Sequence, residues 1–320
     1  MTLSPAWAVD GGRVPASVAR MLAWAATNGS NGVVQATDLA VTALPVPDGA
    51  VNVAPGGALM VNRFGGRAQA QTYVTANDAT IQVAIPPTSS TARTDYLILR
   101  VDDWHFDSSQ QPDNPLDAAY CSLQRVTSLT GIAYPHVALA KITIPASTGT
   151  ITPAMITDLR QVANPRTKRV LRPNALIWTE TETLQNTTAQ GEYWPNKGGT
   201  QDVFIPEWAT RVKIRADWLS IAMPAGDVQG RVWVSFGDWD GKSWGKACQE
   251  FAFDNVQATN GSRQNFTVVD EMSIPASLRG RSVHFQAWAR KMGKTSPVID
   301  GISGFSLDLT FEEVADSSTT

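Results

Sequence analysis

The chain has 320 residues, of which 43% are hydrophobic and 17% are charged, which is typical of a soluble globular protein of about two domains and excludes disordered and fibrous classes. Its formal net charge is −3 and its isoelectric point is near 5.6, so it lacks the basic field that nucleic-acid binding requires. No apolar run approaches the roughly 20 residues of a membrane-spanning helix. We therefore expect neither a nucleic-acid partner nor membrane insertion.

The first half of the sequence predicts one helix followed by short strands. Residues 15–27 have Pro15 at a first-turn position and a stop at Asn28-Gly29, so we expect a helix there, with Val18, Met21, Leu22 and Ala25 on one face. Beyond it the apolar residues alternate, which predicts strands. We expect strand, turn and strand around 51–61, a hairpin at Asn77-Asp78, strands near 96–101, 120–126 and 136–144, and one or two helical turns within 152–160.

A change of composition divides the chain. Residues 1–179 contain no glutamate, and eight of the eleven tryptophans lie in the second half. Between the halves, residues 164–174 are basic and bracketed by prolines, which predicts an exposed linker. The predicted domains are therefore 1–163, a small β-domain, and 175–315, with the linker 164–174 between them and a disordered tail at 316–320.

The second half predicts longer strands with one buried face. Alternating apolar residues occur in 211–221, 228–236, 282–289 and 305–311. In the last of these, Phe305, Leu307, Leu309 and Phe311 share one side, and Ser306, Asp308 and Thr310 share the other. We therefore predict a mainly all-β protein whose C-terminal domain is an antiparallel β-sandwich or jelly-roll-like fold.

The cysteines and the N-terminus carry no special chemistry. Cys121 and Cys248 lie in different halves and fit neither a disulfide framework nor a zinc spacing, so we expect both to be small apolar residues of the interior. Residues 1–5 show no basic stretch before an apolar core, so we read no secretory signal. We expect synthesis in a cytoplasm.

Several motifs, taken in order, resemble those of minor tail proteins of long-tailed bacteriophages. They are residues 51–61 (VNVAPGGALMV), 73–78 (YVTAND), 95–102 (DYLILRVD) and 151–160 (ITPAMITDLR). Residues 203–212 (VFIPEWATRV) also resemble the opening strands of sandwich domains in minor tail proteins of phages that infect actinobacteria. The resemblance covers about two thirds of the chain. It implies a first half attached to the tail tip or baseplate and an outward-facing second half, often as a trimer.

Residues 102–107 contain three aspartates and a histidine. Asp102, Asp103, His105 and Asp107 could in principle ligate a metal ion. No EF-hand loop or His-x-x-x-His pair accompanies them, so we interpret the cluster as a solvated strand end leading into a loop. We predict no metal site and no cofactor.

Loop aromatics supply the candidate binding residues. Residues 238–245 place Asp238, Trp239, Asp240 and Trp244 around a glycine-rich turn. Aromatic faces and carboxylates are the groups that recognise sugars, but Asp-Gly is also a common hairpin turn, and the sequence leaves both interpretations open. Trp194 belongs to a second, weaker aromatic cluster at 193–195. These five residues are our candidate glycan-binding residues.

The sequence offers little support for catalysis. His105, His136 and His284 accompany no nucleophile elbow or phosphate-binding loop, so we predict no catalytic residues and no enzyme. The leading hypothesis is a virion tail-tip protein, homotrimeric, whose partners are other tail or baseplate proteins and a host-surface glycan or receptor. One alternative is a purely architectural tail protein without host contact. The alternative of another class is an envelope polysaccharide depolymerase, which needs paired carboxylates across a cleft.

Overall fold

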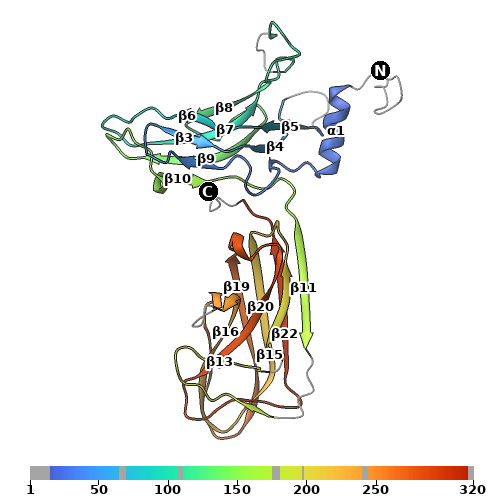
Figure 1. Ribbon diagram of the computed structural model, residues 1–320, viewed down its shortest axis with the longest axis vertical. Helices are drawn as coiled ribbons and strands as arrows, with labels where there is room; N and C mark the ends of the chain where they lie inside the picture. Colours follow the sequence, from blue (N-terminus) through green and yellow to red (C-terminus); the bar gives the residue numbers. More distant parts are fainter. Residues whose placement is uncertain are drawn as a thin grey trace. The chain divides into compact units, whose positions relative to one another are not determined.

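The computed structural model describes residues 15–64, 70–106, 111–174, 181–196, 198–239 and 244–315. The chain forms two compact units (Figure 1). Unit 1 comprises Met1–Pro165 together with Val314–Thr320, and unit 2 comprises Arg166–Glu313. The division falls two residues after the boundary predicted from composition. The tail predicted at 316–320 lies outside the described residues.

In its described residues, unit 1 is a β-structure of three small sheets with one α-helix. The sequence predicts the mainly β character and the helix. Sheet A has the order β1-β4-β5, sheet B has β2-β3-β6, and sheet C has β10-β9-β7-β8, with all of these pairings antiparallel. The elements are α1 (Ala16–Ala26), β1 (Gly32–Val33), β2 (Val41–Ala43), β3 (Ala50–Val53), β4 (Gly56–Val61), β5 (Thr72–Asn77), β6 (Ile81–Ala84), β7 (Arg93–Val101), β8 (Cys121–Val126), β9 (His136–Ile144), η1 (Pro153–Met155) and β10 (Ile156–Asp158). Residues 156–158, predicted as part of a helical turn, instead form a strand after the single 3₁₀ turn.

The two predicted turns around Pro55 and Asn77 do not reverse the chain. β3 pairs with β6, and β4 pairs with β5, so the four strands form one long two-stranded ribbon interrupted midway. The register shifts by one residue between Val53↔Ile81 and Gly56↔Asn77. Proline and glycine mark a kink here because proline cannot donate a ladder hydrogen bond. Asn77 spans the interruption by donating from Nδ2 to the carbonyl of Ala54 at 3.2 Å.

The helix forms where the sequence predicts it, but its apolar face is exposed. Asn28 and Gly29 adopt positive φ angles of 52° and 66° and end the helix. None of its residues is buried. Met21 is 46% exposed and Leu22 is 48% exposed, although both are large and apolar. α1 lies at one side of unit 1, next to β5 (Figure 1).

The motifs that carry the tail-protein resemblance have structural roles in unit 1. Asp95 is fully buried and receives hydrogen bonds from Arg93 Nε at 2.9 Å and Arg125 Nη1 at 3.0 Å. Arg160, whose side chain is also fully buried, pairs with Asp158 at 2.7 Å. It also donates from Nη1 to the carbonyls of Ala36 and Asp38 at 3.1 and 2.6 Å. These motifs therefore specify buried polar links between strands and loops.

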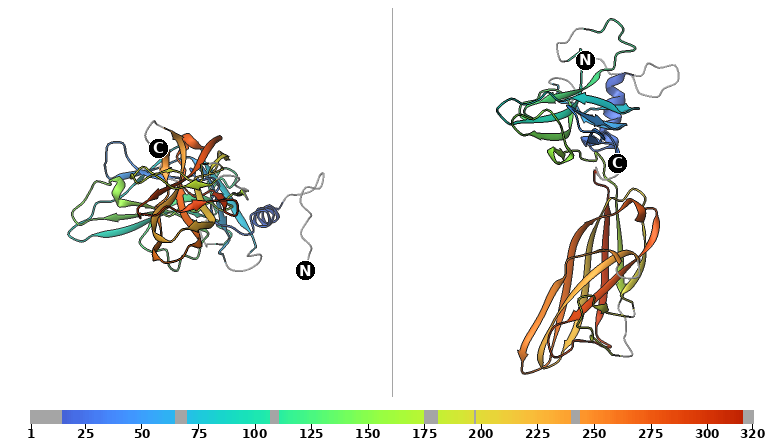
Figure 2. Two further views of the ribbon diagram at one scale, coloured as in Figure 1. Left: turned by 90° about the horizontal axis from the view of Figure 1, so that it is seen from below. Right: turned by 60° about the vertical axis from the view of Figure 1, so that its left-hand side comes forward.

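Unit 2 is an antiparallel β-sandwich of two sheets, seen edge-on in the right-hand view of Figure 2. Sheet D has the order β11-β22-β15-β21-β12, with β19 also paired to β15, and sheet E has β13-β20-β16-β17, with β14 on β20 and β18 on β16. The strands are β11 (Thr167–Asn174), β12 (Glu182–Thr183), β13 (Glu192–Tyr193), β14 (Thr200–Ile205), β15 (Arg211–Met223), β16 (Gly226–Trp239), β17 (Trp244–Ala247), β18 (Phe251–Ala258), β19 (Ser262–Ser273), β20 (Arg281–Lys291), β21 (Val298–Ile299) and β22 (Gly304–Glu312), with η2 (Ala276–Leu278) between β19 and β20.

The alternation predicted for the long strands is confirmed in the core of the sandwich. In β22, Phe305, Leu307, Leu309 and Phe311 are at most 3% exposed, and the residues between them are only half-buried. The core packs the inner faces of both sheets, with the rings of Phe285 and Phe311 6.4 Å apart. Burial of one face of each sheet supplies the main driving force for folding this unit.

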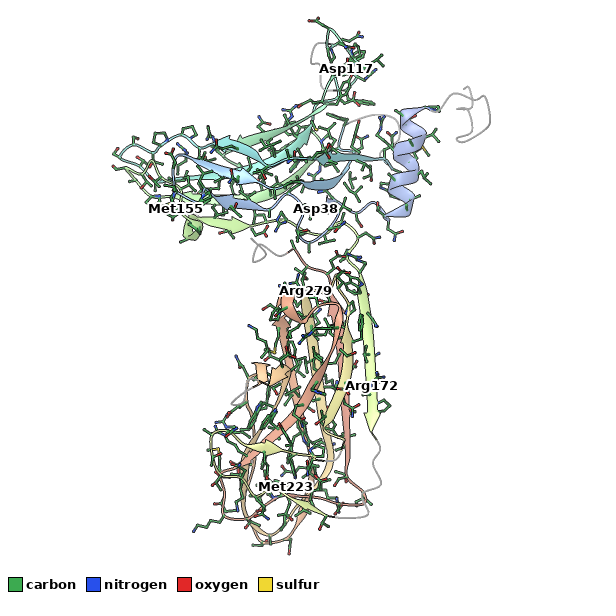
Figure 3. The ribbon with its side chains drawn as sticks, in the orientation of Figure 1. Asp38, Asp117, Met155, Arg172, Met223 and Arg279 are labelled. Carbon is green, nitrogen blue, oxygen red and sulfur yellow. The ribbon has the colours of Figure 1, made fainter. Side chains whose placement is uncertain are left out.

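The predicted linker is wrong over most of its length, because residues 167–174 form strand β11. This strand pairs with β22 along its whole length, from Thr167↔Glu312 to Asn174↔Phe305. Of its basic residues, Arg169 lies on the outer face of sheet D and pairs with Asp308 at 2.6 Å. Lys168 and Arg172 alternate with it and lie opposite Phe311 and Leu307 of β22. Arg172 projects away from the sandwich in Figure 3. A basic, proline-bracketed segment can thus be an edge strand, and edge strands are commonly protected by charge and proline.

The outer face of sheet D is covered by ion pairs between neighbouring strands. Lys213 pairs with Glu312 at 2.7 Å, and Arg211 pairs with Glu271 at 2.6 Å. These side chains are 21–51% exposed, so each pair contributes little to stability but keeps the face well hydrated. Within the described part of the chain, no helix is long and apolar enough to cross a membrane.

Candidate functional site

The predicted turn at 238–245 is a hairpin. β16 ends at Trp239 and β17 begins at Trp244, and the two residues are paired in the antiparallel ladder. Asp238 is exposed and forms an ion pair with Arg281. Asp240 and the side chains of Trp239 and Trp244 lie outside the described residues. The hairpin interpretation of this segment is therefore confirmed, and its glycan-binding role stays a prediction.

Trp194 does not offer a surface for a ligand to stack on, contrary to the prediction that it is a loop aromatic. It is only 2% exposed and belongs to the core of the sandwich, where its ring stacks on Phe266 with centroids 6.4 Å apart. Its carbonyl accepts a hydrogen bond from the indole of Trp218 at 2.8 Å. β13 ends at Tyr193, whose side chain lies on the outer side against Trp288. The next residue, Trp194, is directed into the core.

A groove with a volume of about 360 Å³ opens beside β13. Sites for small ligands have volumes of ~300–1,000 Å³, so the groove lies within this range. It is lined by Glu182, Thr183, Glu192, Tyr193, Trp194 and Asn196. We call it the β13 groove. It combines an aromatic ring, two carboxylates and an amide, which are the side-chain types expected of a sugar-binding surface.

The aromatic wall of the β13 groove rests on a rigid support. Tyr193 is 37% exposed, and its ring meets the ring of Trp288 edge-on at 4.5 Å. Trp288 in turn stacks on Trp233 at 5.9 Å and 6° between planes. The indole of Trp288 donates to Ser235 Oγ at 2.6 Å. Because Trp288 and Trp233 are each only 7% exposed, they hold the Tyr193 ring in place before any ligand arrives.

The carboxylates of the β13 groove also order its loops. Glu182 Oε2 accepts a hydrogen bond from the backbone amide of Asn196 at 2.7 Å. Glu192 Oε1 accepts hydrogen bonds from the backbone amides of Asn186, at 3.0 Å, and Gln185. These bonds fix the positions of two negative charges on the groove wall. The groove therefore favours neutral, hydroxyl-rich ligands over anionic ones, since hydroxyl groups donate to carboxylates and anions are repelled.

The structure does not bring Trp194 together with the hairpin at 238–244. The chain enters unit 2 at Arg166 and leaves it at Glu313, which are joined by an ion pair of 2.7 Å. The hairpin at 238–244 lies toward the end of unit 2 where Arg166 and Glu313 meet, since Gly237 pairs with His284 near the start of β20. Tyr193 instead pairs with Trp288 in the second half of β20. Glu182 pairs with Ile299 of β21. This pairing lies near the opposite end of unit 2, which Met223 marks in Figure 3. The β13 groove thus lies in the half of unit 2 farther from its chain ends.

Sequence reasoning missed Glu182, Glu192 and Asn196. The one feature of the sequence that could have indicated them is that the first glutamates of the chain occur close to the aromatic pair at 193–194. Glu182 reaches the groove because β12 joins sheet D through β21, and Glu192 reaches it because β13 joins sheet E. No spacing rule in the sequence predicts that strands of different sheets meet at one groove.

The acidic cluster at 102–106 is organised by its own neighbours. Asp102 accepts a hydrogen bond from Ser122 Oγ at 2.7 Å, and Asp103 accepts one from Tyr73 Oη at 3.0 Å. His105 Nδ1 lies 3.0 Å from Asp103 Oδ1. Asp107 lies outside the described residues. Among the residues that the structure describes, no three side chains of histidine, cysteine, aspartate or glutamate converge to hold a metal ion.

The remaining histidines, His136 and His284, and the two cysteines have ordinary environments. His136 is 6% exposed, and burial lowers its pKa from the usual value while Nδ1 lies 3.1 Å from the carbonyl of Tyr134. His284 is exposed and pairs with Asp202. Burial raises the pKa of the Cys248 thiol to about 12, so it stays protonated at neutral pH and is unreactive. Cys248 is confirmed as a buried cysteine, whereas Cys121 is only half-buried.

Comparisons with known proteins do not assign the chain to a family. No family model matches it, and no curated protein matches it. Among solved structures it is similar to that of infectious bursal disease virus Gx strain, with 14% identity, a TM-score of 0.28, and coverage of 88% of this chain and 69% of the other. It is also similar to an isomalto-dextranase of Arthrobacter globiformis, with 11% identity, a TM-score of 0.22, and coverage of 83% and 36%. A third match is to carbohydrate-binding modules of the β-sandwich superfamily, with 12% identity, a TM-score of 0.17, and coverage of 87% and 98%.

Proposed function

We propose that the chain is a structural protein of a bacteriophage tail tip, in which unit 1 attaches to the tail or baseplate and unit 2 binds a glycan of the host surface. The ordered motifs of the first half support the tail assignment. The observation that carries the binding role is the β13 groove, where the preorganised ring of Tyr193 lies beside the carboxylates of Glu182 and Glu192. The β13 groove would bind the glycan without cleaving it and without a cofactor.

The glycan assignment fits the position of the groove within unit 2. Attachment through unit 1 constrains the end of unit 2 where Arg166 and Glu313 lie, and the groove lies toward the other end. A single shallow groove gives weak affinity. Several copies on one virion would convert that weak affinity into firm adhesion, because the second and later contacts are intramolecular.

Replacing Tyr193 with alanine should weaken saccharide binding by the full-length protein at least tenfold. The change removes the stacking surface but leaves both carboxylates in place. Binding would be measured by calorimetry against neutral saccharides of glucose, galactose, mannose, arabinose and N-acetylglucosamine, with polygalacturonate as an anionic comparison. We expect a neutral saccharide to bind better than polygalacturonate because the groove is lined by two carboxylates.

Phe204→Ala is the matched control, since Phe204 is an exposed aromatic of the same unit, 49% exposed, on the neighbouring strand β14. It should leave binding unchanged. The proposal is wrong if no saccharide binds, or if Tyr193→Ala and Phe204→Ala behave alike. Release of new reducing ends from any bound saccharide would instead identify a depolymerase.

We further propose that the chain acts as a homotrimer. Several large apolar side chains of unit 2 are strongly exposed in the single chain, namely Leu171, Val269, Met292 and Ile302, at 48–67%. Symmetric oligomers commonly bury such side chains between subunits. Light scattering during size-exclusion chromatography should give three times the mass of 34.4 kDa. A stable monomer at micromolar concentration would contradict the trimer and favour a subunit held only by its virion neighbours.

A further inference from the structure

Unit 1 contains a pocket that the sequence did not predict, although Met60, Tyr73 and Val101 of the motifs described above line it. Its volume is about 360 Å³, and it lies between α1, β4, β5 and the facing ends of β7 and β8. Met60 and Val101 are at most 3% exposed and form apolar walls together with the ring of Tyr73. Arg20 of α1 also lines this pocket, which we call the α1 pocket. A mainly apolar pocket with a few polar groups is the usual form of a binding site.

Arg20 brings a guanidinium with unused hydrogen-bonding capacity to the α1 pocket. Its guanidinium carbon lies 4.7 Å from the centroid of the Tyr73 ring, and its Nε donates to Gln71 Oε1 at 2.6 Å. Among the residues that the structure describes, none accepts a hydrogen bond from its two terminal nitrogens. The guanidinium is therefore held in place by Tyr73 and Gln71, and the N–H groups of its two terminal nitrogens have no acceptor among the described residues.

The other arginines of unit 1 show how unusual this is. Each of Arg93, Arg100, Arg125 and Arg160 forms an ion pair with an aspartate. Within the described part of unit 1, the remaining arginine without a carboxylate partner is Arg63, which is exposed to solvent. Arg20 is half-buried, so its positive charge is less well hydrated. A guanidinium fork matches a carboxylate in two parallel hydrogen bonds.

Asp103 also lines the α1 pocket, but its carboxylate is already engaged. Oδ2 accepts from Tyr73 Oη at 3.0 Å, and Oδ1 accepts from the backbone amide of His105 at 3.1 Å. His105 Nδ1 lies 3.0 Å from the same Oδ1. The pocket's own groups thus occupy Asp103, whereas Arg20 still has donors to offer. Charge complementarity therefore favours an anionic group carried on an apolar stem.

We propose that the α1 pocket receives a carboxylate-bearing side chain of a neighbouring protein, with its carboxylate on Arg20 and its apolar stem against Met60 and Val101. The exposed face of α1 indicates a protein rather than a free small acid. Met21 and Leu22 on this helix are 46% and 48% exposed, and a protein surface would cover them whereas a small acid would not. The identity of the neighbour as a tail protein rests on the proposed function; the carboxylate chemistry does not.

Three probes with one apolar stem test this chemistry on the full-length protein: hexanoate, hexylamine and hexanol. A ligand-observed NMR titration should show that hexanoate binds most tightly and that Arg20→Met weakens it at least tenfold. Arg63→Met is the matched control and should leave hexanoate binding unchanged. Arg20→Lys keeps the positive charge but loses the two parallel N–H donors of the guanidinium, so it should bind hexanoate more weakly than the unchanged protein and more tightly than Arg20→Met. Hydrogen exchange of α1 and β5 would verify that each variant is folded.

Tighter binding of hexylamine would overturn the proposal, because it would make Asp103 the recognition group. Equal binding of all three probes, or hexanoate binding that survives Arg20→Met, would also overturn it. These outcomes are independent of glycan binding by unit 2, so failure here and failure of the proposed function are distinguishable.

Phage particles assembled with variant chains separate a protein partner from a free acid. Arg20→Met and the double change Met21→Ser with Leu22→Ser should each reduce the amount of the chain in purified particles, as measured by immunoblot. Tyr193→Ala should not, since it lies in unit 2. Normal incorporation of the Met21 and Leu22 variant would show that the pocket serves a small acid and would overturn the docking proposal.

Discussion

Replacing Arg160 with methionine is expected to lower the free energy of unfolding of unit 1 by about 3–5 kcal/mol. The Arg160 side chain is fully buried and forms an ion pair with Asp158. It also donates to the carbonyls of Ala36 and Asp38. Methionine fills a similar volume but leaves the carbonyls of Ala36 and Asp38 without this donor, and an unpaired buried polar group is costly. It also removes the ion pair with Asp158, whose carboxylate keeps the hydrogen bond from the backbone amide of residue 160.

The same change should loosen a specific part of the fold. Asp38 Oδ2 accepts a hydrogen bond from the amide of Gly57 at 3.0 Å. Gly56 approaches Asp38 so closely that a Cβ there would lie 2.4 Å from the Cβ of Asp38. Arg160 therefore fastens the loop at 35–39 to β10 and, through Asp38, to the start of β4. We expect faster hydrogen exchange in these segments and unchanged exchange in unit 2.

Denaturant unfolding of the full-length protein, followed by hydrogen exchange and mass spectrometry, would measure the effect. Arg63→Met is the control, since it removes an exposed arginine of the same unit and should cost less than about 0.5 kcal/mol. Arg160→Lys should fall between the two because lysine keeps the charge but loses the fork. Equal stability of the Arg160→Met and Arg63→Met proteins would show that the buried network contributes nothing.

Trp218→Ala should destabilise unit 2 by a similar amount, about 3–5 kcal/mol. Trp218 is fully buried in β15, and its ring meets that of Phe305 edge-on at 5.0 Å. Alanine would leave a cavity between the two sheets. It would also remove the hydrogen bond from the indole to the carbonyl of Trp194, which helps to fix β13 and the groove beside it.

Leu219→Ala is the matched control for this prediction. Leu219 is the next residue of β15 but is 40% exposed on the opposite face, so its truncation should cost less than about 1 kcal/mol. Denaturant unfolding of both full-length variants gives the comparison. Trp218→Phe keeps most of the ring volume and should recover part of the loss. If Trp218→Ala and Leu219→Ala were equally stable, the assignment of Trp218 to the core would be wrong.

Much of the fold follows from local patterns. Alternation in β22 and β15 predicts which side chains are buried, because a strand between a core and water must segregate its two faces. Pro15 and Asn28-Gly29 delimit α1, since both ends depend on backbone preferences of a few residues. The change of composition, together with the basic stretch that begins at residue 164, predicts a boundary two residues before the division at Pro165.

The tertiary structure alone decided how the strands pair and what each turn residue does. Pro55 and Asn77 have the composition of hairpin turns but mark a kink in one long ribbon, because the partner of each strand lies elsewhere in the chain. Residues 167–174 look like a linker but pair with β22, which is 130 or more residues away in the sequence. Local propensity cannot predict such pairings, since their stability comes from distant partners.

The candidate sites show the same division. The sequence by itself determined a mainly β protein of two parts, the tryptophan-rich character of the second, and an aromatic cluster at 193–194 next to the first glutamates. Only the tertiary structure decided that Trp194 points inward and Tyr193 outward, and that Glu182 and Glu192 share its groove. It also gathered Arg20, Tyr73 and Asp103 around one pocket. The physical reason is that a binding site depends on which strands become neighbours, and packing of the whole core selects those neighbours.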